Sequence, residues 1–133
     1  MARVLLARRT MTYARIALGK TGEDLACAEL EKRGYAIIAR RYRRRRGEID
    51  IVARDGPTIV FVEVKARDSH AFGEAAEAVT ACKRRRITQL ALDYMTRQRL
   101  SNCPCRFDVV SIQMNAGQST IEVFQGAFDA TGD

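Results

Sequence analysis

Two carboxylates and one lysine are placed where a divalent metal ion could be held. Asp50 lies in the alternating stretch EIDIVAR, and Glu63 and Lys65 share one face of the apolar stretch TIVFVEVKA that follows. The tripeptide DGP between these stretches predicts a turn, so they should form a hairpin. Pairing outward from that turn puts Asp50 opposite Glu63, with Cβ atoms about 5 Å apart. Like charges there repel each other, and Mg²⁺ or Mn²⁺ between them would remove the repulsion.

A salt-bridge cluster at a sheet edge is the alternative interpretation of these three residues. One of the two carboxylates could also stay protonated. The apolar strand around Glu63 and Lys65 favours the metal site, because charged residues in such a strand are costly unless they serve a function.

Glu23 is a candidate third carboxylate. It shares a helical face with Ala26, Cys27 and Leu30, and a carboxylate on a packed face needs a partner. The alternative is a capping role, because the stretch TGED that begins at Thr21 resembles a capping box and a helix start favours an anion. Both interpretations stay open at this point.

Two basic clusters accompany these acidic residues. Residues 40–46 hold six arginines and should lie between two strands, while residues 83–86 read KRRR in the first turn of a helix. Cations there oppose the helix dipole, so an anion from outside would explain them. The alternative is a solvated surface. The residues predicted to contact phosphate are Arg40, Arg41, Arg43, Arg44, Arg45, Arg46, Lys83, Arg84, Arg85 and Arg86.

The overall charge supports a nucleic-acid partner. The chain of 133 residues carries a net charge of +7 and has a pI near 9.7. All 23 basic residues fall within residues 1–106, against 12 acidic ones, and 19 of them are arginines, whose planar forks suit phosphate. No apolar run approaches the roughly 20 residues of a membrane helix, so we expect no membrane partner. The cysteine spacing predicts reduced thiols and a cytoplasmic protein.

The elements that would position these residues form a mixed α/β domain. We expect helices at residues 21–33, or from about residue 12, and at residues 81–97, capped by Thr80. Strands are expected at residues 35–40, 48–54, 58–66, 106–113 and 120–125. The order α-β-β-β-α-β-β predicts a central sheet of about five strands flanked by helices.

Taken together, these residues resemble the YraN family of uncharacterised bacterial proteins over residues 19–123. The matching stretches are GKTGEDLACAEL, GEIDIVARDG, VFVEVKAR, AEAV with KRRR, and CRFDVV. That family looks like the PD-(D/E)xK nucleases, and most closely the archaeal Holliday-junction resolvases. The resemblance implies a restriction-endonuclease-like fold and a helix glutamate, a strand aspartate and an E-x-K motif. These roles fall on Glu23, Asp50, Glu63 and Lys65.

The resemblance also implies how the chain is divided. Residues 19–125 would be the nuclease-like domain, between a basic N-terminal arm (1–18, with Met11 as another possible start) and a C-terminal tail (126–133). The resolvases act as dimers, so a homodimer is implied by resemblance alone. A Q-x-x-x-Y motif found in some nuclease branches is absent, because Gln89 is followed four residues later by Asp93. No specific substrate can therefore be carried over.

We therefore expect a structure-specific endonuclease that hydrolyses phosphodiesters, on DNA rather than RNA. Asp50 and Glu63 would ligate Mg²⁺ or Mn²⁺, with Glu23 as a direct or water-mediated third carboxylate, and Lys65 would position the attacking water or stabilise developing charge. A non-catalytic nucleic-acid-binding protein on the same fold is the first alternative. A scaffold for a protein partner is the second, but it leaves the arginine clusters unexplained.

Overall fold

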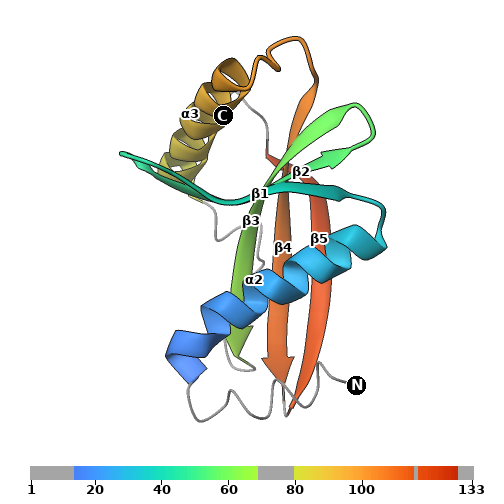
Figure 1. The fold of residues 1–133 in the computed structure, drawn as a ribbon. Helices are drawn as coiled ribbons and strands as arrows, with labels where there is room; N and C mark the ends of the chain where they lie inside the picture. Colours follow the sequence, from blue (N-terminus) through green and yellow to red (C-terminus); the bar gives the residue numbers. More distant parts are fainter. Residues whose placement is uncertain (1–13, 69–79, 116, 129–133) are drawn as a thin grey trace.

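The computed structural model describes residues 14–68, 80–115 and 117–128 (Figure 1). Most of the expected N-terminal arm, with Met11, and the end of the expected C-terminal tail lie outside these residues. The elements are α2 (Ala14–Lys32), β1 (Ala36–Arg44), β2 (Gly47–Asp55), β3 (Thr58–Asp68), α3 (Ala81–Arg97), β4 (Cys105–Asn115) and β5 (Gln118–Phe128). The predicted order α-β-β-β-α-β-β is confirmed. Neither described helix is long and apolar enough to cross a membrane.

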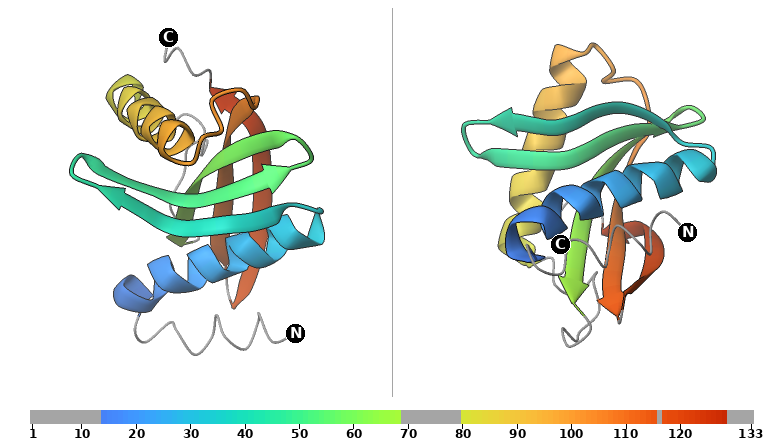
Figure 2. Two further views of the ribbon diagram at one scale, coloured as in Figure 1. Left: turned by 45° about the horizontal axis from the view of Figure 1, so that its top comes forward. Right: turned by 60° about the horizontal axis from the view of Figure 1, so that its bottom comes forward.

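The five strands form one sheet in the order β1-β2-β3-β4-β5. Neighbouring strands are antiparallel except β3 and β4, which are parallel and are joined by the crossover through α3. The strand β3 is therefore central, as its apolar sequence predicts. The two helices cover opposite faces of the sheet (Figure 2). A mixed α/β sheet with helices on both faces is the predicted fold class.

The alternation of residues along β3 divides the core between these faces. Ile59 and Phe61 pack into the cluster beneath α3, whereas Val60 and Val62 pack into the cluster beneath α2. The hairpin of β2 and β3 has the predicted register, starting from the pair Asp55–Thr58. Glu63 and Lys65 continue the α3-facing row. The sequence therefore predicted correctly which face these two side chains occupy.

Helix α3 has the predicted bounds. The Thr80 hydroxyl accepts a hydrogen bond from the backbone N–H of Lys83 at 3.2 Å, which caps the helix. Its apolar stripe is buried against the sheet, with Ile87, Leu90 and Tyr94 among the residues at the interface.

Helix α2 begins at Ala14, so the capping box predicted at Thr21 is wrong. Thr21 is buried inside the helix at 7% exposure, and packing against the sheet outweighs the local capping signal. The next residue, Gly22, allows the helix to approach β3 closely. A Cβ atom on Gly22 would lie 2.8 Å from the Cβ of Ala66.

Strand β1 is longer than predicted and takes in most of the arginine cluster. It runs to Arg44, which pairs with Gly47, so only Arg45 and Arg46 form the turn. The prediction that this strand ends at Arg40 is therefore wrong. Because β1 is an edge strand, its solvent-facing positions accept arginines, and Tyr42 anchors the strand by packing its ring edge-on against Tyr94 at 5.1 Å.

Strand β5 is also longer than predicted, because it continues to Phe128. The ring of Phe128 stacks on that of Phe107 at 4.8 Å, so the first residues of the expected tail belong to the sheet. Beside this pair, buried Asp108 accepts hydrogen bonds from the Tyr35 hydroxyl and from the Arg106 guanidinium, each at 2.9 Å. This network joins β4 to the residue that precedes β1 and carries a structural role.

Candidate functional site

Asp50 lies where the regular pairing of β2 and β3 ends. The last paired residues are Ile51 and Val62, so the predicted direct pairing of Asp50 with Glu63 is wrong. The Asp50 carboxylate instead accepts a hydrogen bond from the backbone N–H of Val64 at 2.8 Å. Beyond Asp50 the strand turns over, since Ile49 packs beneath α3 although Ile51 packs beneath α2. This irregularity leaves the Asp50 side chain bridging the two strands.

The Asp50 carboxyl group holds its proton unusually strongly. Burial raises its pKa, and repulsion from the Glu63 carboxylate raises it further, from 3.8 to about 7. The hydrogen bond from Val64 acts in the opposite direction but does not cancel these effects. The two carboxylates therefore do interact, as the sequence predicted, although they are not a directly paired couple.

Glu63 is 9% exposed, and its carboxylate forms ion pairs with two lysines. The Nζ atom of Lys83, from the first turn of α3, lies 2.6 Å from Glu63 Oε2. The Nζ atom of Lys65 lies 3.6 Å from the same oxygen. Burial and the neighbouring Lys83 ammonium lower the pKa of Lys65. Burial also acts to lower the pKa of Lys83, but its interactions with Glu63, Lys65 and Asp50 together outweigh burial and raise the pKa.

Glu23 is held by arginines of β1. Its carboxylate, 7% exposed as a residue, accepts from Arg40 Nη2 at 3.1 Å and from Arg41 Nε at 3.4 Å. The predicted position at a helix start is wrong, because α2 begins nine residues earlier. The prediction that Glu23 shares a packed face with Ala26 and Leu30 is confirmed. The Glu23 charge also contributes to the raised pKa of Asp50, so it acts on the same site.

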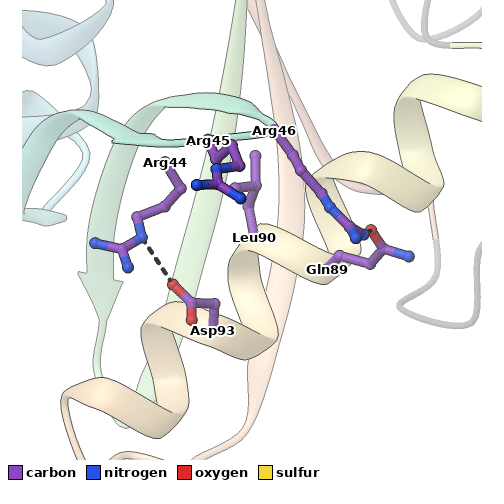
Figure 3. A pocket seen from close by; sticks show the side chains of 6 residues that line it. All are labelled: Arg44, Arg45, Arg46, Gln89, Leu90 and Asp93. Carbon is purple, nitrogen blue, oxygen red and sulfur yellow. Dashed lines mark hydrogen bonds and ion pairs between the residues drawn. The ribbon is translucent and has the colours of Figure 1, made fainter.

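The remaining arginines of the first cluster surround the turn between β1 and β2. Arg43 pairs with Glu48 at 2.9 Å, and Arg44 Nε lies 3.3 Å from Asp93. Glu48, which lies on the same strand as Asp50, is thus turned toward Arg43. A pocket of about 290 Å³ opens between this turn and α3. Figure 3 shows its lining residues, Arg44, Arg45, Arg46, Gln89, Leu90 and Asp93.

The second basic cluster lies beside the first. Arg46 Nη1 donates to Gln89 Oε1 at 3.1 Å, and the side chain of Arg86 runs close over Gly47. Figure 1 shows the β1–β2 turn reaching α3 on this side. Among the described residues, Arg84 Nε is a buried nitrogen without a hydrogen-bond partner. The fold therefore joins two clusters that are 37 residues apart in sequence into one cationic surface.

Two features of the site were not predicted from the sequence. One is the contact of Lys83 with Glu63, because no local pattern fixes how the first turn of α3 meets β3. The other is Asp93, which accepts from the Tyr42 hydroxyl at 2.7 Å and also pairs with Arg44 and Arg97. Asp93 and Arg97 are four residues apart on one helix, a spacing that could have indicated their pairing.

The residues that could hold a metal ion are Asp50 and Glu63, through their carboxylates. Within residues 14–68, 80–115 and 117–128, no group of three or more His, Cys, Asp or Glu side chains could hold a metal ion. Magnesium is commonly held by one or two carboxylates and keeps several waters. The chemistry of this pair fits such an ion, and a cation would offset the repulsion that raises the Asp50 pKa.

Comparisons with known proteins identify relatives along most of the chain. The sequence profile of the "Uncharacterised protein family UPF0102" matches residues 22–112. A UPF0102 protein of Geobacter metallireducens is 48% identical over 113 residues, covering 85% of this chain and 93% of the relative. One from Syntrophotalea carbinolica is 42% identical over 122 residues, covering 92% and 99%. One from Pseudomonas aeruginosa is 43% identical over 115 residues, covering 84% and 92%.

Proposed function

The chain belongs to the UPF0102 family, as its resemblance to the YraN proteins predicted, and we propose that it is a nucleic-acid-binding protein that hydrolyses phosphodiesters with a divalent metal ion. The observation that carries the proposal is the joint environment of Asp50 and Glu63. Two carboxylates whose charges interact, one with a pKa raised to about 7, border a surface rich in arginine. This combination suits a cation held against a phosphate.

Asp50 and Glu63 would hold Mg²⁺ or Mn²⁺. The bound ion would polarise a phosphoryl oxygen and make its water ligand easier to deprotonate. Lys65, which lies 3.6 Å from Glu63 Oε2, would stabilise the charge that develops on the phosphate or position the attacking water. The hydrogen bond from Val64 would keep the Asp50 carboxylate in place without any change in the strands.

Glu23 has a different role in this proposal from the one that the sequence suggested. Its carboxylate is engaged by Arg40 and Arg41, so we assign it to orienting these arginines at the edge of the site. A water-mediated contact with the metal remains compatible with this role. Glu23 would then act on the phosphate through the arginines rather than as a direct ligand.

The basic clusters would bind the nucleic-acid backbone without reading sequence. Arginines supply most of the positive charge on this surface, and phosphate contacts position a protein on nucleic acid rather than specify bases. We retain DNA as the expected substrate, and the homodimer stays a prediction from resemblance. A binding protein without catalysis would use the same surface but would not need the two neighbouring carboxylates of Asp50 and Glu63.

The proposal is tested first by metal binding. Titration calorimetry with Mn²⁺ should show a weak site in the wild-type protein and no site in Asp50→Asn. Glu48→Gln is the matched control, because it removes one carboxylate of the same strand that is paired with Arg43. Metal binding unchanged in Asp50→Asn, or lost equally in Glu48→Gln, would contradict the proposed site.

A further inference from the structure

We propose that Lys83 closes the metal site of the free protein and leaves Glu63 when a divalent ion binds, to contact a phosphate of the nucleic acid. The inference rests on the proposed function, because it concerns the same carboxylates. It adds a residue from α3 to a site otherwise built from β2 and β3.

In the free protein, Lys83 forms an ion pair with Glu63. The ammonium lies 2.6 Å from Glu63 Oε2, which is closer than Lys65 at 3.6 Å from the same atom. Mg²⁺ lies about 2.0–2.1 Å from its oxygen ligands, so an ion on Glu63 Oε2 and an ammonium 2.6 Å from the same atom would repel each other strongly. Both cations cannot hold Glu63 Oε2 in the same way, so they compete for it.

Of the two lysines, Lys83 is the one that can move away from Glu63. Lys65 stands two residues after Glu63 on the same central strand, and 21% of its side chain is exposed. Lys83 comes from another element, and 33% of its side chain is exposed. A lysine side chain has a flexible stem of four carbons, so it can turn away while the helix stays in place. The cap at Thr80 uses the backbone N–H of Lys83 and is unaffected by such a turn.

Once it has left Glu63, the Lys83 ammonium would lie beside the other basic residues of its helix turn. With a divalent ion on Glu63, Lys83 would be left beside a metal and Lys65, and like charges this close repel. The nearest basic neighbours on its helix turn are Arg84 and Arg85, and Arg85 is exposed. A phosphate that approaches this turn would accept from the Lys83 ammonium and from the Arg85 guanidinium. A metal ion on Glu63 would free Lys83 to contact phosphate, and a phosphate on Lys83 would free Glu63 to bind the metal. Binding of the metal and binding of the phosphate would therefore favour each other.

The test compares three proteins: the wild type, Lys83→Met and Arg85→Met. Both variants remove one positive charge from the same helix turn, but Arg85 is exposed and is not among the partners of Glu63. Mn²⁺ is titrated into each protein, and the free ion is followed by electron paramagnetic resonance. Lys83→Met should bind Mn²⁺ about tenfold more tightly than the wild type, because a direct competitor is gone. Arg85→Met should change the affinity by no more than about twofold, as expected for a solvent-exposed charge.

A second measurement uses a fluorescent DNA duplex in EDTA. Without a metal ion the Lys83 ammonium stays in its ion pair with Glu63. The variant Lys83→Met should therefore weaken duplex binding less than Arg85→Met does. Melting temperatures show that each variant is folded. Equal Mn²⁺ affinity in all three proteins would overturn the role of Lys83 and leave the metal site standing. No Mn²⁺ binding in any of them would overturn the proposed function together with this inference. A larger loss of duplex binding in Lys83→Met than in Arg85→Met would show that Lys83 is not tied to Glu63.

Discussion

The Asp50 carboxylate accepts a hydrogen bond from the backbone N–H of Val64, at the point where β2 and β3 stop pairing residue by residue. The side chain takes the place that a carbonyl of β2 would occupy in a regular ladder. The carboxylate is therefore fixed by the sheet itself, close enough to Glu63 for their charges to interact. As the proposed metal ligand, Asp50 would need no rearrangement when an ion binds.

The first prediction concerns stability and pH. Folding raises the pKa of Asp50 from 3.8 to about 7, so the folded protein holds a proton that the unfolded chain releases. Asp50 therefore lowers the free energy of unfolding progressively as pH rises from 3.8 to about 7, by at most about 1.4 kcal/mol per pH unit. Asp50→Asn keeps an acceptor for Val64 and removes this dependence.

Urea unfolding in EDTA at several pH values measures the effect. The variant should be more stable than the wild type at about pH 8, and the difference should shrink as pH falls toward 4. A difference between the two proteins that stays constant with pH would show that Asp50 does not carry the proton.

The second prediction concerns the arginines around the β1–β2 turn. Arg43 and Arg45 are exposed, whereas Arg44 pairs with Asp93 of α3 and is best left in place. Replacing Arg43 and Arg45 with Ala should weaken duplex binding for all sequences alike. The slope of log affinity against log salt should flatten by about 1.8, since each phosphate contact contributes about 0.9.

A control variant for this measurement replaces Lys32 and Arg33, at the end of α2, with Ala. It removes the same charge from the end of α2, which precedes β1, whereas the turn follows the other end of that strand. If both variants lose the same affinity and the same salt slope, only net charge matters and the turn is no phosphate site.

The third prediction concerns Gly22. Alanine favours a helix over glycine by about 1 kcal/mol, yet a Cβ here would lie 2.8 Å from the Cβ of Ala66. Overpacking of this kind costs about 1–3 kcal/mol, so Gly22→Ala should lower the free energy of unfolding. Adding Ala66→Gly should recover part of the loss in a double-mutant cycle. A stabilised Gly22→Ala protein would mean that α2 does not pack this closely on β3.

How far the sequence predicts this site depends on the range of the interactions. The hairpin register and the face that carries Glu63 and Lys65 were predictable, because alternation and the turn at residues 55–57 are local signals. The bounds of α3 were predictable for the same reason, from Thr80 and its apolar stripe. The hydrogen bond from the Val64 N–H to the Asp50 carboxylate was not predictable. A side chain replaces a backbone acceptor of the ladder only where the strand becomes irregular, and no local pattern indicates that place.

The errors share one physical cause, which is packing between elements far apart in sequence. At Thr21, burial of the helix against the sheet outweighs the local capping signal. The arginines of residues 40–44 belong to an edge strand, which packs on α3 through Tyr42. The contact of Lys83 with Glu63 depends on where α3 starts relative to β3. No pattern within either segment carries that information.

The fourth prediction concerns Lys65. Lys83 lies closer to Glu63 than Lys65 does, so Lys65→Met leaves Glu63 neutralised and should change the melting temperature little. Cleavage should fall by about 100-fold or more, because Lys65 is proposed to act on charge that develops in the transition state. Duplex affinity should stay close to that of the wild type. A large drop in melting temperature, or cleavage that survives in Lys65→Met, would remove Lys65 from the mechanism.

The most direct test of the central claim is a cleavage assay with the wild type and Asp50→Asn. Labelled duplex, flap, junction and single-stranded DNA, and the corresponding RNA, are incubated with Mg²⁺ or Mn²⁺, and with EDTA as the metal-free control. The wild type should cut at least one substrate only when the metal is present. Asp50→Asn should bind that substrate with similar affinity but cut it at least about 100-fold more slowly, as expected when the metal is lost. Absence of cleavage by the wild type on every substrate, or equal cleavage by Asp50→Asn, would contradict the account.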